Sequence, residues 1–263
     1  MINDLVFLSI FQGIAEFLPI SSNGHMIVLE QLFGINSSGI NMHVVLHFGS
    51  LLALLIYFSK DICLMIFGIW IHDIKKLKKH PAKRYRDLTG ILVLSSIPVI
   101  AVGFLVKKYF GTTAESLKII GIASIFFGVL LIVADANPVK DNFPTYKNGA
   151  LIGLFQCMAF IPGASRSGTC ITAARFCGLG RTEATRFAFL MAIPTILGAC
   201  TLVGLDAPNF KELFTNNQLI LMGTIAGLGI LTIHSLLWFL KKFSFISFGI
   251  YRIIFGIFLL LFM

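Results

Sequence analysis

Long apolar runs separated by short polar stretches dominate the hydrophobic pattern of this chain. Six of them approach the ~20 apolar residues that a helix needs to cross the hydrocarbon of a bilayer. Because backbone polar groups in lipid must be satisfied within the segment itself, such runs are expected to be helical. The pattern therefore predicts six transmembrane helices, at residues 42–58, 88–106, 117–133, 184–203, 219–240 and 245–262.

Two further apolar segments contain residues that break a helix before it could cross the bilayer. Residues 4–33 are interrupted at Pro19 and residues 149–177 at Pro162, each time beside serine and glycine. Non-helical backbone at membrane depth persists only where protein or a polar cavity satisfies its amides. The two segments are therefore predicted to be re-entrant helical hairpins.

The chain divides into two halves, residues 1–134 and 149–263, joined by a linker rich in Asn, Pro and Asp. Each half contains one hairpin and three spans, and a proline three residues before Ser22 or Ser165 marks each break. Because three is odd, the second half enters from the opposite face, and such inverted repeats bring paired broken helices together around a ligand. The predicted fold is an all-α polytopic membrane protein with two inverted-topology repeats, whose hairpins form one site.

Composition agrees with a membrane protein and explains the net charge of +9. The chain is 57% hydrophobic and 13% charged, with a mean hydropathy of +0.89, whereas soluble domains carry about 25% charged residues. Eight of the 21 basic residues fall between Lys60 and Arg86. This clustering is typical of a cytoplasmic loop under the positive-inside rule and argues against nucleic-acid binding. It also predicts that the first hairpin opens to the outer face.

The first hairpin carries an acid, hydroxyls and an imidazole within ten residues. Gln12 and Glu16 lie four residues apart, on one face of a helix. Ionisable groups at membrane depth are costly and therefore functional by default, which singles out Glu16, whereas Gln12 could equally serve helix packing. Ser22 and His25 could each act as nucleophile, base or acid toward a phosphoryl group. Ser21 is expected to bind the substrate beside them. Alternatively, Ser21 or Ser22 would cap the following helix, and His25 would be a buried core histidine.

The second hairpin presents a base instead of an acid. Its glycine-rich loop runs into a helix start, where unpaired amides and the helix dipole favour an anion. Arg166 adds a planar guanidinium that matches phosphate oxygens, although it could also be a cytoplasmic anchor. The residues expected to bind phosphate here are Gly163, Ser165, Arg166, Ser167, Gly168 and Thr169.

The remaining histidines and arginines of interest are interpreted as packing, basic-loop or boundary residues. His43, His47 and His234 are expected to be helix-packing or cavity residues, His72 and His80 belong to the basic loop, and Arg175, Arg181 and Arg186 mark the cytoplasmic boundary.

Phosphoryl transfer depends on charge neutralisation and alignment, which a carboxylate-held cation facing an arginine supplies. We therefore expect a divalent metal, Mg²⁺ or Ca²⁺, held by Glu16 with Gln12. The apolar surroundings suit a substrate with a long lipid tail. The attacking group could be Ser22, His25 or a metal-activated water.

These motifs resemble those of the undecaprenyl pyrophosphate phosphatase family, also called the bacitracin-resistance proteins. The resemblance rests on QGIAE, FLPISSNGH and PGASRSG and extends over nearly the whole chain, including FLMAIPTILGA. It implies a bacterial plasma-membrane enzyme that dephosphorylates the C55 polyprenyl diphosphate, recycling the lipid carrier of cell-wall synthesis. It also implies that Glu16 binds metal, that Ser22 and His25 act at the phosphate, and that Arg166 holds it. Gln12 departs from the second glutamate found in many members.

Two other functions are compatible with the predicted architecture. Inverted repeats with broken helices also occur in transporters, so a polyprenyl-phosphate transporter or flippase is the alternative, and a non-catalytic membrane scaffold is the third. The combination of nucleophile, acid/base, metal-binding acid and phosphate clamp favours the enzyme. The expected partners are the polyprenyl diphosphate and the membrane, without nucleic acid, and a homodimer is compatible with this interpretation.

Overall fold

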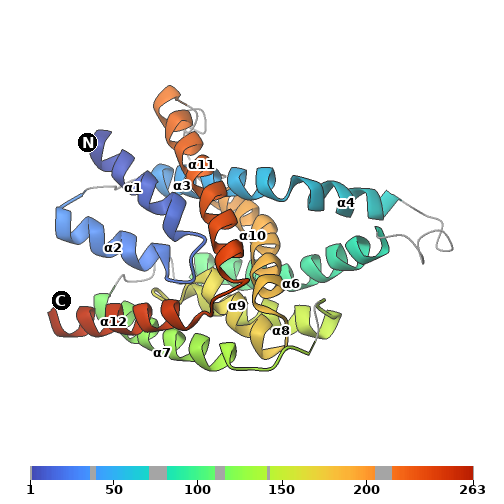
Figure 1. Cartoon of the computed structure of the whole chain (residues 1–263). Coiled ribbons are helices and arrows are strands. Elements are labelled where there is room, and N and C mark those ends of the chain that lie inside the picture. Colours follow the sequence, from blue (N-terminus) through green and yellow to red (C-terminus); the bar gives the residue numbers. More distant parts are fainter. Residues whose placement is uncertain are drawn as a thin grey trace.

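The computed structural model describes residues 2–35, 40–70, 82–109, 116–140, 143–204 and 215–262. Within these ranges the chain is helical and contains no strand (Figure 1). The first half forms α1 (Ile2–Ala15), α2 (Ser22–Phe33), α3 (Ile40–Tyr57), α4 (Ser59–Trp70), α6 (Ala82–Tyr109) and α7 (Leu117–Asp135). The second half forms α8 (Tyr146–Gln156), the 3-10 turn η1 (Cys157–Phe160), α9 (Arg166–Phe176), α10 (Arg181–Gly204), α11 (Asn216–Phe239) and α12 (Ile246–Phe262).

Several of these helices are long and apolar enough to cross a bilayer, which makes the chain a multi-pass membrane protein. Four qualify within the described ranges, namely Arg84–Tyr109, Leu117–Asp135, Arg181–Thr201 and Asn216–Phe239. A fifth would be the pair formed by α3 and α4, whose axes differ by 72°. α12 is apolar but shorter, with 17 residues. Each of the six predicted spans lies within a helix to within one residue at its ends, while their number and the inverted repeats stay predictions.

The segment after residue 58 differs from the sequence-based prediction. We expected a polar loop from Lys60 to Arg86, but its first part is the helix α4, which packs against the start of α6. The reason is the apolar run DICLMIFGIW, which carries one acid and no base, whereas the lysines that define the basic cluster come after it. That acid, Asp61, accepts a hydrogen bond from Arg186 at 2.9 Å. Residues 71–81, including His72 and His80, lie outside the described ranges.

The closest helix pair is α7 with α12, which run side by side along one edge of the molecule (Figure 1). Glycines allow this approach, because a Cβ on Gly128 would lie 2.9 Å from the carbonyl oxygen of Gly249, and one on Gly121 would lie 3.0 Å from that of Gly256. Small residues are the usual means by which membrane helices pack closely. The two α12 glycines flank Arg252 on the buried face of this helix, so the packing aims Arg252 into the protein.

Asp135, at the end of α7, joins the linker to the second half. Its carboxylate accepts bonds from Arg181 at 2.7 and 3.0 Å and from the amide of Phe245 at 3.0 Å. Arg175 donates to the carbonyls of Asp135, Asn137 and Leu179. Arg175 is 2% exposed, so its side chain does not reach the protein surface, and its position at the cytoplasmic boundary stays a prediction. Its guanidinium instead satisfies carbonyls where the linker passes α9.

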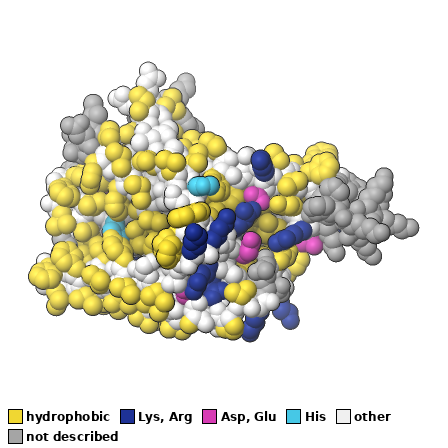
Figure 2. All heavy atoms as spheres, in the orientation of Figure 1, with side chains coloured by type: hydrophobic (Ala, Val, Ile, Leu, Met, Phe, Trp, Pro, Cys, Tyr) yellow, Lys and Arg dark blue, Asp and Glu magenta, His cyan; other side chains and the backbone are white. Residues whose placement is uncertain are grey.

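Charge is unevenly distributed over the surface. Figure 2 shows Lys and Arg side chains, with acidic ones among them, gathered toward the end where α4 and the start of α6 project, while most of the remaining face is hydrophobic. A basic end beside an apolar belt is the pattern that the positive-inside rule associates with the cytoplasmic side.

Candidate active site

Glu16 is the centre of the polar cluster between the two hairpins. Its carboxylate accepts hydrogen bonds from Gln12 Nε2 at 3.0 Å and from Ser22 Oγ at 2.6 Å. Arg166 of the second hairpin donates to the other carboxylate oxygen at 2.5 Å. The structure thus brings together four residues singled out from the sequence, and they come from both hairpins.

The backbone at the two helix starts explains why these side chains meet. Ser21 precedes α2 with φ 75° and Ser165 precedes α9 with φ 70°, and in the described part of the chain no other non-glycine residue has a positive φ. Such strained serines cluster at functional sites, where surrounding structure enforces them. They make Ser22 and Arg166 the first residues of their helices.

This geometry corrects the pairing of the two motifs. The sequence aligned Ser22 with Ser165 by their distance from proline, but the helix starts pair Ser21 with Ser165 and Gly24 with Gly168. The second loop is one residue longer after its proline, because Gly163, with φ 92°, adds a turn.

The polar groups of the second hairpin are largely engaged with one another. Ser165 Oγ accepts the Gly168 amide at 3.1 Å and thereby caps α9, and its carbonyl accepts the Thr169 amide at 2.8 Å. Thr169 Oγ1 donates to the Arg166 carbonyl at 2.9 Å. Gly168 and Thr169 therefore do not offer the free amides that the sequence suggested, and they support the helix start instead. Ser167 Oγ donates to the Leu18 carbonyl at 3.1 Å, which ties the two loops together.

Ser21 and His25 are hydrogen-bonded to each other and not to Glu16. Ser21 occupies the N-cap position without a side-chain capping bond. Its carbonyl oxygen lies 2.9 Å from His25 Nδ1, which must donate because a carbonyl can only accept. His25 Nε2 lies 2.7 Å from the hydroxyl of Tyr251, and the ring stacks on Phe255 with centroids 3.9 Å apart. Both ring nitrogens of His25 are thus engaged away from Glu16.

Among the described residues, an imidazole close to Glu16 belongs to His47 of α3, which the sequence predicted to be a helix-packing or cavity residue. Its Nδ1 lies 4.0 Å from Glu16 Oε1. His47 lines a small cavity with Gln12, Ser22 and Asn23. The volume of this cavity is about 10 Å³, close to the minimum for one water molecule. His234 bonds Tyr57 at 3.4 Å, as expected of a packing residue, whereas the side chain of His43 lies outside the described set.

Arg252 of α12 is the site residue that the sequence analysis missed. Its side chain is fully buried. It donates to the carbonyls of Gly163 at 2.9 Å and Ala164 at 2.8 Å in the second loop, and to that of Pro19 at 3.3 Å in the first. One guanidinium therefore holds both loops. An arginine inside the apolar run IYRIIF was a signal for function that could have identified it.

A comparison with protein families identifies the relatives of this chain. The family model described as bacitracin resistance protein BacA matches residues 5–258 of the 263. This chain belongs to the bacitracin resistance protein family. The matched range includes both hairpins and Arg252, so the cluster described above is a feature of a bacitracin resistance protein and not of an unrelated membrane helix bundle.

Oxygen donors in the cluster suit a hard divalent cation. Glu16 offers a carboxylate, Gln12 an amide and Ser22 a hydroxyl, and Mg²⁺ commonly takes one or two carboxylates together with substrate phosphates and water. Among the described residues, no group of three or more His, Cys, Asp or Glu side chains forms a complete protein cage. The three oxygen donors of Glu16, Gln12 and Ser22 fit such a cation.

Proposed function

We propose that this bacitracin resistance protein is a phosphatase of the bacterial plasma membrane that hydrolyses undecaprenyl (C55 polyprenyl) diphosphate. The products are the monophosphate and inorganic phosphate, so the reaction recycles the lipid carrier for cell-wall synthesis. The observation that carries the proposal is the bridging of Ser22 and Arg166 by Glu16, at 2.6 and 2.5 Å. A hydroxyl, a carboxylate and a guanidinium converge there inside an apolar protein.

Arg166 and the bound cation would neutralise the phosphate charge. The small cavity lined by Gln12, Ser22 and His47 holds about one water, so a diphosphate requires a rearrangement, in which we propose that Arg166 separates from Glu16. The guanidinium then turns to the phosphate oxygens, for which its planar fork is suited. A divalent cation held by Glu16 and Gln12 would supply further charge neutralisation when bound. Burying a diphosphate without such partners would be prohibitive in a low-dielectric site.

The contacts favour Ser22 as the nucleophile. Its hydroxyl already donates to Glu16 Oε2 at 2.6 Å, whereas both ring nitrogens of His25 are engaged by Ser21 and Tyr251. In the proposed step Ser22 Oγ attacks the terminal phosphorus and its proton passes to Glu16. The bond between phosphorus and the bridging oxygen breaks, and the lipid monophosphate leaves. Water then hydrolyses the phosphoserine, which releases phosphate.

Helix contacts support two inverted repeats of three spans and one hairpin each. α1 packs on α11 and α8 packs on α6, while α3 contacts α11 and α10 contacts α6. In the proposed repeats, α1, α3, α6 and α7 correspond to α8, α10, α11 and α12, in that order. Replacing each helix by its counterpart converts the contact of α1 with α11 into that of α8 with α6, and the contact of α3 with α11 into that of α10 with α6. Two further contacts, α7 with α12 and α3 with α10, join equivalent helices. In this arrangement the basic end is cytoplasmic and the first hairpin opens to the outer face.

Cysteine labelling tests this topology. Single cysteines at Ser38 and Lys79, on a background without reactive native thiols, should be labelled from opposite faces of the membrane. Labelling of both from one face would contradict the inverted repeats.

Phosphate release tests the activity. Purified protein in detergent should release phosphate from undecaprenyl diphosphate when Mg²⁺ or Ca²⁺ is present, and Ser22→Ala should abolish release. Ser96→Ala is the matched control, because Ser96 Oγ donates only within its own helix, to Leu92, at 2.8 Å. Acid quenching with a radiolabelled terminal phosphate should trap label on Ser22. Translocation of a lipid phosphate across vesicles without any phosphate release would favour the transporter, and full activity in Ser22→Ala would assign the attack to water.

A further inference from the structure

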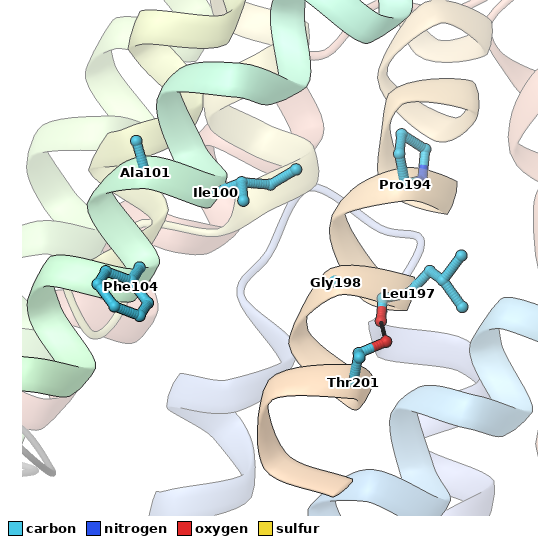
Figure 3. Close-up of a pocket in the computed structure, with 7 residues that line it drawn as sticks. All are labelled: Ile100, Ala101, Phe104, Pro194, Leu197, Gly198 and Thr201. Atoms are coloured by element: carbon cyan, nitrogen blue, oxygen red, sulfur yellow. Dashed lines mark hydrogen bonds between the residues drawn. The ribbon is translucent and has the colours of Figure 1, made fainter. Parts of the chain in front are cut away.

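A lipid-facing groove lies between α6 and α10, apart from the Glu16 cluster. Figure 3 shows its walls, which belong to these two helices and face one another across a gap. The groove has a volume of about 590 Å³. Its lining includes Ile100, Ala101 and Phe104 of α6 and Leu197, Gly198 and Thr201 of α10.

The lining presents almost no polar group to an occupant. Its one hydroxyl, on Thr201, already donates to the Leu197 carbonyl at 2.7 Å (Figure 3). Gly198 keeps the floor low, since a Cβ built there would meet only Ile100 Cγ1, at 3.9 Å. The groove therefore suits a hydrocarbon and leaves room for a branched one.

Two contacts link the helices that form the groove to the second hairpin. Phe160 of η1 packs on α6, because its ring would lie 3.1 Å from a Cβ on Gly103, next to the groove residue Phe104. On the other wall, Thr195 donates to Gln156 at the end of α8, at 3.3 Å. Met158, Phe160 and Ile161 are all at least partly exposed. They extend the apolar surface along the chain from the groove toward the loop that carries Arg166.

The groove also lies at a suitable depth. Its residues are in the C-terminal halves of α6 and α10. Both helices begin near the basic end of the molecule, at Arg84 and Arg181. With the proposed topology, the groove lies in the outer half of the membrane, where the proposed function also places the phosphate site.

We propose that the groove binds the polyprenyl chain of the substrate, a site that rests on the proposed function. A water molecule occupies about 30 Å³ of liquid, and we take a carbon atom with its hydrogens to need about the same volume. The 590 Å³ of the groove then accommodates roughly 20 carbon atoms, or about four isoprene units. With the diphosphate at Arg166, the first units cross the exposed face of η1 and the next units fill the groove. The remainder of a long chain stays in the bilayer.

Binding in such a groove contributes selectivity more than affinity. Lipid tails are as apolar as the groove, so the hydrophobic effect gives no net drive and packing decides. A side chain that fills the groove should therefore raise KM for the C55 substrate by about ten-fold, the lower end of what the loss of one methylene contact costs, with kcat unchanged. A C5 substrate, whose tail is too short to reach the groove, should be unaffected.

The experiment uses full-length protein in nanodiscs and a polyprenyl phosphate with a diazirine in its third to fourth isoprene units. Gly198→Leu fills the groove, and Gly198→Ala is a milder version that preserves folding. Gly223→Leu is the matched control, because Gly223 is a helical glycine with nothing within 4 Å of its Cβ position. Thermal unfolding of each variant verifies that it is folded. After illumination, mass spectrometry locates the crosslinks.

Crosslinks should concentrate on residues 100–104 and 194–201, fall in Gly198→Ala, disappear in Gly198→Leu and persist in Gly223→Leu. Two results would overturn the proposal and show that the groove is a generic lipid-facing gap. One is labelling of these residues that is unchanged in Gly198→Leu, and the other is equally strong labelling of them by a diazirine phospholipid. The photolabel does not require turnover. Groove labelling without phosphate release would therefore retain the lipid site and reject the phosphatase, whereas phosphate release without groove labelling would do the reverse.

Discussion

Replacing Arg252 with methionine should separate the two hairpins. The guanidinium donates to the carbonyls of Pro19, Gly163 and Ala164, at 2.8 to 3.3 Å, and is fully buried. Methionine has a similar length and no donor. The substitution therefore leaves three buried carbonyls without their partner while preserving most of the side-chain volume.

The expected loss follows from these contacts. Leaving a buried polar group unsatisfied costs about 1–3 kcal/mol, so three carbonyls give about 3–9 kcal/mol. The substitution also removes the cost of burying the Arg252 guanidinium, which offsets part of this loss. Breaking a buried charged network typically lowers the free energy of unfolding by about 3–5 kcal/mol. At about 2–4 °C per kcal/mol for a chain of this size, the melting temperature should fall by roughly 6–20 °C. Activity should fall further, because Arg166 and Ser22 would no longer be aligned on Glu16.

Thermal unfolding in detergent and phosphate release measure the two effects. Lys118→Met is the control, since Lys118 is an exposed base on α7, the neighbour of α12. Arg252→Lys should retain part of the stability and less of the activity, because an ammonium cannot span both loops as a planar fork does. An Arg252→Met protein with unchanged melting temperature and turnover would refute the conclusion that Arg252 holds the loops together.

Two further predictions concern Glu16 and its partners. Glu16→Gln should abolish metal-dependent turnover, while Gln12→Glu should keep activity and lower the Mg²⁺ or Ca²⁺ concentration needed, because a second carboxylate strengthens a hard-cation site; phosphate release against metal concentration measures both, and a wild-type metal response in Glu16→Gln would refute the assignment. Arg166→Lys should lose most activity, since a point charge cannot reproduce the bidentate fork; kcat/KM measures the loss, and near-wild-type values would mean that charge alone suffices.

Local signals in the sequence were enough to locate the helix breaks and most of the cluster. Apolar periodicity interrupted by Pro19 and Pro162 marks the ends of α1 and α8, whatever packs around them. The spacing of four residues places Gln12 and Glu16 on one helical face. Their meeting with Arg166 then required only that two broken helices face each other, which the repeated pattern of the halves already predicted.

Contacts between distant residues were beyond the reach of such signals. His25 meets Tyr251 across 226 positions of sequence, and no local pattern indicates that its Nε2 points to α12 and not to Glu16. Likewise, His47 lies near Glu16 because α3 crosses α1, which depends on packing. For Arg252, the sequence does show a charged residue inside an apolar run, which indicates function. It does not show which groups the guanidinium contacts.

The pairing of the two helix starts shows how related hairpins could acquire complementary tasks. Counting back from the strained serines, Gln12 and Gln156 each stand nine residues before, and Glu16 and Phe160 each stand five residues before. Where the first hairpin has the carboxylate, the second has a ring that packs on α6 beside the groove. Where the second has Arg166, the first has Ser22, and both contact Glu16. Glu16 thus contacts the first residue of both α2 and α9. The corresponding position in the second hairpin holds Phe160 in place of an acid, and it faces the hydrocarbon part of the proposed substrate.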